Sequence, residues 1–125
     1  MNVFPGAGTL LVALALAAPF AAQAAPAPKV AQEVNHLLGY IAKSGCSFYR
    51  NGAWIDASSA EAHARAKFDQ LAQRGEIASV ADFIEKAASK SSVTGLPYQV
   101  KCVGAPPTLT RNWLSEEQAR HQTKR

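Results

Sequence analysis

The dipeptide Asn51-Gly52 constrains the fold of this chain more than any other feature of its sequence. Asn-Gly is the preferred pair for a two-residue type I′ turn, because both positions need a positive φ and the twist of the turn matches that of the flanking strands. If these two residues form the loop, Arg50 lies opposite Ala53 and the register of the neighbouring pairs follows. The stretch CSFYRNGAWID, residues 46–56, therefore predicts a β-hairpin.

Side chains alternate between the two faces of this predicted hairpin. One face carries Cys46, Phe48 and Ile55, which suit a protein core. The other face carries a cross-strand aromatic pair, Tyr49 and Trp54. This pair must be exposed, covered by another segment of the chain, or used for binding.

The first 24 residues have the layout of a secretory signal peptide. An apolar run from Leu10 to Ala22 ends in the small-residue triplet Ala22-Gln23-Ala24, which is typical of a cleavage site. The run is shorter than the ~20 residues that a membrane-spanning helix needs. The sequence therefore predicts cleavage after Ala24 or Ala25, no permanent membrane anchor, and a periplasmic or secreted protein.

The mature chain of about 100 residues suffices for one domain with a single modest core. Thirteen Lys and Arg against nine Asp and Glu give a formal charge of +4, and these charges are scattered along the chain. Nucleic-acid-binding proteins concentrate positive charge on one face or helix, so we expect no nucleic-acid partner. The sequence has no glycine-rich phosphate-binding loop, and we expect no cofactor.

The chain contains two cysteines, Cys46 and Cys102. In an oxidising compartment, an even pair in a small domain indicates a disulfide. A reactive thiol pair is the alternative, but the wide separation lacks the Cys-x-x-Cys spacing of redox sites. The expected bridge would close more than half of the mature chain, and loop entropy makes it worth roughly 4 kcal/mol.

Residues 30–44 have the apolar period of an amphipathic helix, with Val34, Leu37, Leu38 and Ile41 on one side. His36 projects from the opposite side, so we expect it to be a solvated surface residue.

Two more helices follow the hairpin. Ser58 and Glu61 form a predicted capping box at the start of the first, and Gly75 ends it. Ser79, with Asp82 three residues on, starts the second.

After these helices, residues 97–103 predict a strand with Tyr98, Val100 and Cys102 on the core face. The prolines of GAPPT, residues 104–108, predict a stiff, extended linker. A short helix follows, docked by Trp113 and Leu114 and fraying afterwards, and this segment is a candidate cover for the hairpin aromatics.

Together these elements predict a single α+β domain over residues 25–104, with a linker and a short helical tail over residues 105–125. Three helices pack on a small antiparallel sheet made of the hairpin and one strand, and the Cys46–Cys102 disulfide staples the sheet.

The candidate metal ligands are His36, His63 and His121 with scattered carboxylates. Zinc needs three or four converging ligands, and only Glu33 and His36 have compatible spacing. We therefore expect no metal site.

Catalysis would have to use His63 as a base with Ser91 or Ser92 as the nucleophile, and Lys67 lies one helical turn from His63. The sequence has neither a Gly-x-Ser-x-Gly elbow nor a Ser-x-x-Lys helix start. It therefore favours a structural role for these residues. Arg50 is a candidate binding residue, because its forked donors at a rigid turn suit a carboxylate or a phosphate.

Four segments carry a family resemblance: CSFYRNG (46–52), AEAHARAK (60–67), ASKSSVTGLPYQV (88–100) and WL (113–114). Together they resemble a family of small exported proteins of Gram-negative envelopes that is classed as a domain of unknown function. The chain departs from the family pattern at Ala64, where leucine is usual, and at Thr94, where serine is usual.

The resemblance implies periplasmic placement and a shared fold, but no activity. Five polar residues at motif positions come from separate segments: Arg50, His63, Lys67, Ser91 and Tyr98. We therefore ask whether they meet in space.

The sequence favours a non-catalytic module that binds an envelope protein or a cell-wall ligand. The predicted binding residues are Arg50, Tyr49, Trp54, His63, Lys67 and Tyr98. Two alternatives stay open: a small periplasmic hydrolase or transferase that uses His63 with Ser91 or Ser92, and an inhibitor of an envelope enzyme. The sequence predicts neither the ligand nor the oligomeric state.

Overall fold

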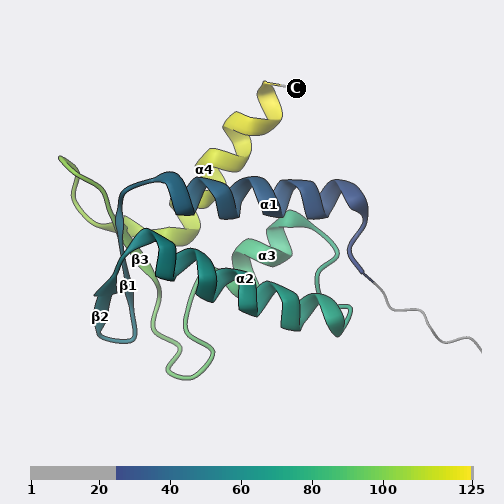
Figure 1. Ribbon diagram of the computed structural model, residues 1–125, viewed down its shortest axis with the longest axis horizontal. Coiled ribbons are helices and arrows are strands. Elements are labelled where there is room, and N and C mark those ends of the chain that lie inside the picture. The colour runs from purple at the N-terminus through teal and green to yellow at the C-terminus, as the bar shows by residue number, and fades with distance from the viewer. Residues whose placement is uncertain (1–24, 125) are drawn as a thin grey trace, which may run out of the picture.

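The computed structural model describes residues 25–124, and the predicted signal peptide lies outside these residues (Figure 1). The elements in chain order are α1 (Pro28–Lys43), β1 (Ser47–Arg50), β2 (Ala53–Ile55), α2 (Ala57–Gln73), α3 (Val80–Ala87), β3 (Gln99–Lys101), β4 (Thr108–Leu109) and α4 (Thr110–Thr123). The predicted α+β class and the disulfide between Cys46 and Cys102 are confirmed. Within residues 25–124, no helix is both long enough and apolar enough to cross a membrane.

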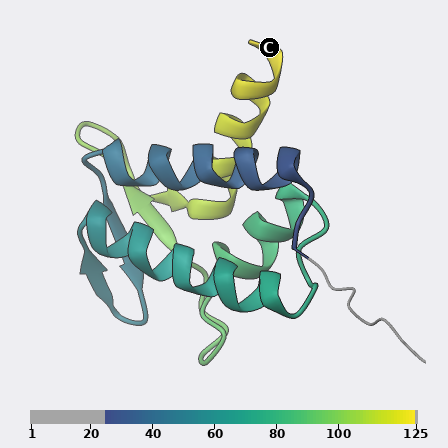
Figure 2. The same cartoon turned by 45° about the vertical axis from the view of Figure 1, so that its right-hand side comes forward.

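Helices α1 and α2 lie side by side, and the sheet lies at the end where α1 finishes and α2 begins (Figures 1 and 2). The sheet has the order β2-β1-β3-β4, and each neighbouring pair is antiparallel. The carboxyl end of α4 projects away from the rest of the molecule in both views.

The hairpin has the predicted register. Asn51 and Gly52 both have positive φ, 52° and 87°, as a type I′ turn requires. Arg50 pairs with Ala53, and the next pair along the strands is the aromatic one. Phe48 is buried in the core, so the hairpin face that was expected to point inward does so.

The start of α2 corrects the predicted capping box. Asp56, not Ser58, is the N-cap, and its carboxylate accepts a 2.8 Å hydrogen bond from the backbone N–H of Ser59. Ser58 already lies inside the helix. A carboxylate at this position also interacts favourably with the positive end of the helix dipole. The bonds from Ser59 hold the pKa of Asp56 below its usual value.

The other helix signals are confirmed. Ser79 caps α3 by accepting a 3.1 Å bond from the backbone N–H of Asp82. Gly75 follows α2 with φ of +72° and ends it. The largest fully buried side chains come from α1, α3, β3 and α4 and form one core: Val34, Leu37, Leu38, Phe83, Val100 and Leu114.

The carboxyl-terminal segment is more ordered than its sequence indicates. β4 follows the two prolines directly and adds a fourth strand to the sheet, pairing Leu109 with Gln99 and Thr108 with Val100. α4 is docked as predicted, with Leu114 fully buried.

α4 does not reach the hairpin aromatics through its tryptophan. The ring of Trp113 lies 4.5 Å from Tyr40 and 5.5 Å from Phe48, on the core side of the sheet. Trp113, the candidate cover, thus packs elsewhere, and Trp54 stays 46% exposed.

The expectation that His36 is simply solvated is also wrong. Its Nε2 lies 2.7 Å from Oε2 of Glu117, and its ring stacks on His121 with centroids 3.7 Å apart. Burial opposes ionisation of Glu117, but the bonds from His36 and Arg120 prevail and hold its pKa below the usual value. α1 and α4 thus share a hydrogen-bonded polar contact.

Candidate functional site

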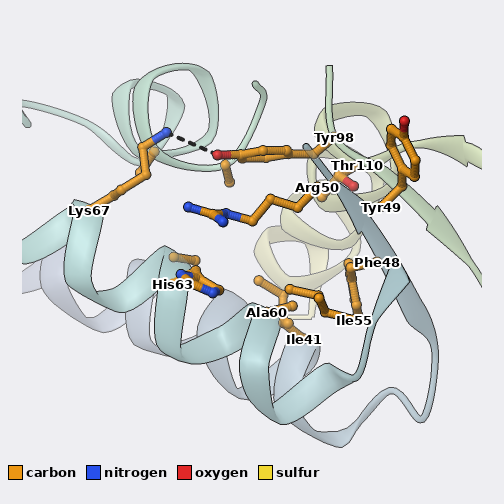
Figure 3. Close-up of a pocket in the computed structure, with 13 residues that line it drawn as sticks. Ile41, Phe48, Tyr49, Arg50, Ile55, Ala60, His63, Lys67, Tyr98 and Thr110 are labelled. Atoms are coloured by element: carbon orange, nitrogen blue, oxygen red, sulfur yellow. Dashed lines mark hydrogen bonds between the residues drawn. The ribbon is translucent and has the colours of Figure 1, made fainter. Parts of the chain in front are cut away.

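Arg50 lies on the core-facing side of the sheet, two residues along β1 from Phe48 (Figure 3). Strand alternation gives Arg50 this direction, and the turn at Asn51-Gly52 leaves it at the end of the strand. Its side chain extends between Tyr98 and His63. The Nε atom is buried, and it hydrogen-bonds to no other group among the described residues.

α2 supplies the second part of the site. His63 and Lys67 are four residues apart, so the helical period places both on the side that faces Arg50 (Figure 3). Burial, and then the charge of Arg50, lower the pKa of His63 below its usual value. His63 is therefore held towards its neutral form.

The segment before β3 supplies the third part. Lys67 Nζ donates to the backbone oxygen of Lys90 at 3.0 Å and to the hydroxyl of Tyr98 at 3.4 Å. The same ammonium lies 5.3 Å from the centre of the Tyr98 ring. These contacts tie α2 to residues 90–98 and fix the Tyr98 ring above Arg50.

These residues line two adjoining spaces, and Arg50, His63, Lys67 and Tyr98 border both. We call the first the inner cavity. It has a volume of about 40 Å³, and an apolar set of residues forms most of its wall: Ile41, Phe48, Ile55, Ala60, Ala64, Ala87 and Ala88. We call the second the outer hollow. It has a volume of about 290 Å³ and adds the polar residues Gln70, Ser91 and Ser92.

Thr110, the first residue of α4, also lines the inner cavity. It is only 4% exposed, and its Oγ1 hydrogen-bonds to no group within residues 25–124. Buried polar atoms normally have partners, and each exception calls for an explanation. Two residues of the inner-cavity lining, Arg50 and Thr110, thus each have a buried polar atom without a hydrogen-bond partner among the described residues.

The site has an uncompensated positive charge. Neither space has an aspartate or a glutamate in its lining. The ion pairs found across residues 25–124 involve neither Arg50 nor Lys67. Two permanent cations therefore face a small cavity without a protein anion beside them.

The two predicted nucleophiles, Ser91 and Ser92, differ in their surroundings. Ser91 is buried, and its Oγ accepts bonds of 3.1 Å from the backbone N–H groups of both Val93 and Thr94. The hydroxyl therefore stabilises the turn at residues 91–95. Ser92 is exposed on the rim of the outer hollow, and no hydrogen bond in the described chain joins either serine to His63.

The structure thus brings together most of the predicted binding residues. Arg50, His63, Lys67 and Tyr98 share one site, and Ser91 borders it. Trp54 is separate. It lies outside both spaces and packs edge-on against Tyr49, with ring centroids 5.4 Å apart, whereas Tyr49 itself also lines the inner cavity. Among the described residues, no group of three or more His, Cys, Asp or Glu side chains could hold a metal ion.

The fold and the site define a small α+β domain with a disulfide and a positively charged pocket whose inner wall is mainly apolar. The family model described as a family of unknown function (DUF5329) matches residues 28–122, and the chain belongs to this family. No curated protein and no solved structure matches the chain.

Proposed function

We propose that this protein is a non-catalytic binding module of the cell envelope that takes up an anionic group in the pocket formed by Arg50, His63, Lys67 and Tyr98. The observation that carries this proposal is the pair of positively charged side chains, Arg50 and Lys67, that border both spaces while neither lining contains an aspartate or a glutamate. A bound anion would supply the negative charge that the lining lacks.

The charge of the pocket supports an anion over other ligands. A guanidinium offers forked donors that match the two oxygens of a carboxylate, and such bonds are shorter and stronger than those between neutral groups. Lys67 adds a second positive charge nearby, while the neutral form of His63 reduces the repulsion with Arg50. The low-dielectric cavity wall strengthens the attraction between Arg50 and an anion.

The placement in the envelope rests on other features. The disulfide between Cys46 and Cys102 fits an oxidising compartment. The signal-peptide pattern of residues 1–24 agrees with export.

A binding role is favoured over hydrolysis or group transfer by the state of the serines. A serine nucleophile needs a base within hydrogen-bond reach. The acceptor sites of Ser91 are taken by the backbone of its own turn, and this arrangement favours a structural role. The inhibitor alternative would use the hairpin tip, which carries no cationic pocket of its own.

The proposal is tested by titrating the protein with sodium acetate, while ¹⁵N NMR follows the side-chain Nε–H resonance of Arg50. We expect a saturable shift of this resonance that sodium chloride at equal ionic strength does not produce. The matched variants are Arg50→Met, which removes the donor, and Arg111→Met, which removes an exposed arginine outside the site. If acetate shifts the backbone resonances of Arg50→Met as strongly as those of the native protein, the pocket is not the anion site.

A further inference from the structure

We infer that the anionic group is a phosphate monoester and that it binds in the outer hollow rather than in the inner cavity. This inference rests on the proposed function and names its ligand class. It follows from the room in the hollow, from the donors that line it, and from their summed charge.

The outer hollow has the room that the inner cavity lacks. Its volume is about 290 Å³, whereas a cavity of ~150 Å³ already holds benzene. Gln70, Ser92 and Val93 line the hollow and are exposed, so it opens to solvent. A monoester can therefore place its phosphoryl group inside the hollow while its organic part extends into solvent.

Arg50 supplies the first donors of this hollow. Figure 3 shows its guanidinium between Tyr98 and His63, directed towards the side on which Lys67 lies. The two Nη atoms hydrogen-bond to no other described residue and, unlike Nε, are not buried. Both Nη atoms are therefore available to the oxygens of a ligand.

Lys67 and Tyr98 each keep a hydrogen for a ligand. The ammonium of Lys67 has three N–H donors, and two of them bond to the backbone oxygen of Lys90 and to the hydroxyl of Tyr98. That hydroxyl accepts from Lys67, and no described residue accepts its own hydrogen. A phosphate monoester has three terminal oxygens, so it can accept from Arg50, Lys67 and Tyr98 at once, whereas a planar carboxylate has only two.

The charge of the hollow matches a dianion. Arg50 and Lys67 contribute two positive charges, and the lining contains no aspartate or glutamate. A phosphate monoester carries about −1.5 to −2 at neutral pH. A carboxylate, a sulfate ester or a phosphate diester carries a single negative charge, so it would leave one of the two positive charges without a counterpart.

The experiment compares four small anions that separate charge from shape: methyl phosphate, methyl sulfate, dimethyl phosphate and acetate. Each is titrated into the disulfide-bonded protein at equal ionic strength and about pH 7.5, where the monoester is a dianion because its second pKa is near 6. The backbone amide shifts of Val93 and Tyr98 give the dissociation constants. We expect methyl phosphate to bind at least tenfold more tightly than each of the others, a difference of about 1.4 kcal/mol.

Two pairs of variants test the assignment of the donors. Lys67→Gln removes one charge, so it should weaken methyl phosphate about tenfold and methyl sulfate less, whereas Lys67→Arg should keep the preference between them. Tyr98→Phe removes only the hydroxyl and should weaken methyl phosphate about tenfold, the effect of one hydrogen bond to a charged group. Tyr40→Phe, outside both spaces, is its matched control and should leave the affinity unchanged. Melting curves confirm that the variants are folded.

A further arm identifies the source of the monoester. Phosphatidylcholine vesicles with and without phosphatidic acid present the same group as a lipid headgroup. Binding to the phosphatidic acid vesicles that is lost in Arg50→Met assigns the group to a lipid, and binding of methyl phosphate without vesicle binding assigns it to a soluble ester. Both results agree with the inference.

The outcomes separate the two proposals. If acetate gives the Arg50-dependent shift but methyl phosphate binds no more tightly than methyl sulfate or acetate, the monoester inference is overturned and the anion site stands. A preference for methyl phosphate that survives in both Lys67→Gln and Tyr98→Phe overturns it as well. If neither acetate nor any of the other anions binds, the proposed function itself fails.

Discussion

Replacing Arg50 by methionine should make the protein more stable while it destroys the anion site. Arg50 is the only arginine in the pocket lining, and its buried Nε bonds to no group within residues 25–124. Methionine retains most of the aliphatic stem, and so most of the packing. It removes the unpaired donor and the repulsion between Arg50 and Lys67.

The magnitude follows from the cost of a buried donor without an acceptor, which is about 1–3 kcal/mol. Arg50 is only partly buried, so we take the lower end and expect an increase of about 1 kcal/mol in the free energy of unfolding. For a domain of this size, that increase raises the melting temperature by about 4–8 °C.

The assay is thermal and urea unfolding followed by circular dichroism, with Arg111→Met as the control for the loss of one exposed positive charge. The control should remain within about 0.5 kcal/mol of the native protein. A fall in the stability of Arg50→Met would show that the guanidinium holds the fold together, and the reasoning that assigns it to a ligand would be refuted. A gain would fit the general pattern in which binding residues reduce stability.

Three further predictions concern the fold. Changing Cys46 and Cys102 together to alanine should lower the free energy of unfolding in urea by about 4 kcal/mol through loop entropy, and a loss below about 1 kcal/mol would contradict this. The pKa of His63 is lower in the folded protein than its usual 6.5, so the unfolded chain binds the proton at a higher pH than the folded protein does. The free energy of unfolding therefore falls as the pH drops through 6.5 and below. The melting temperature of His63→Gln should therefore fall less between about pH 7.5 and 5 than that of the native protein, and parallel curves would refute the assignment. Gly52→Ala should lower the free energy of unfolding by about 1–2 kcal/mol, because φ at this position is +87°. Gly39→Ala, in open space on α1, should raise the free energy of unfolding by up to about 1 kcal/mol. Equal effects of the two substitutions in urea unfolding would count against the assignment of the turn.

The hairpin could be predicted from the sequence because its information is local. Asn51 and Gly52 determine the turn, and the turn determines which residues pair. The start of α2 was predicted wrongly at Ser58, because Asp56 is an equally good N-cap by residue type and the sequence does not say which of the two lies outside the helix. The extended backbone at Asp56 decides in its favour.

The site could be predicted only in part. The polar residues of separate segments indicated Arg50, His63, Lys67 and Tyr98, and strand alternation from Phe48 puts Arg50 on the core face. The sequence did not indicate that the Nε of Arg50 is buried without a partner. Thr110 was missed because nothing near it in the sequence marks it as special. Its position depends on β4, which follows two prolines that ordinarily disfavour a strand, and β4 exists because β3 offers a free edge for pairing.

The contact between α1 and α4 gives the end of the chain a graded stability. Near the start of α4, Leu114 is fully buried, whereas further along the helix polar bonds predominate, as between Gln118 and Glu33 at 3.1 Å and between Arg120 and Tyr40 at 3.2 Å. Backbone amides should therefore exchange hydrogen progressively faster towards Thr123, while the amides around the fully buried Leu114 stay protected. A fluorophore or affinity tag attached at the carboxyl end can then report on partners without disturbing the pocket.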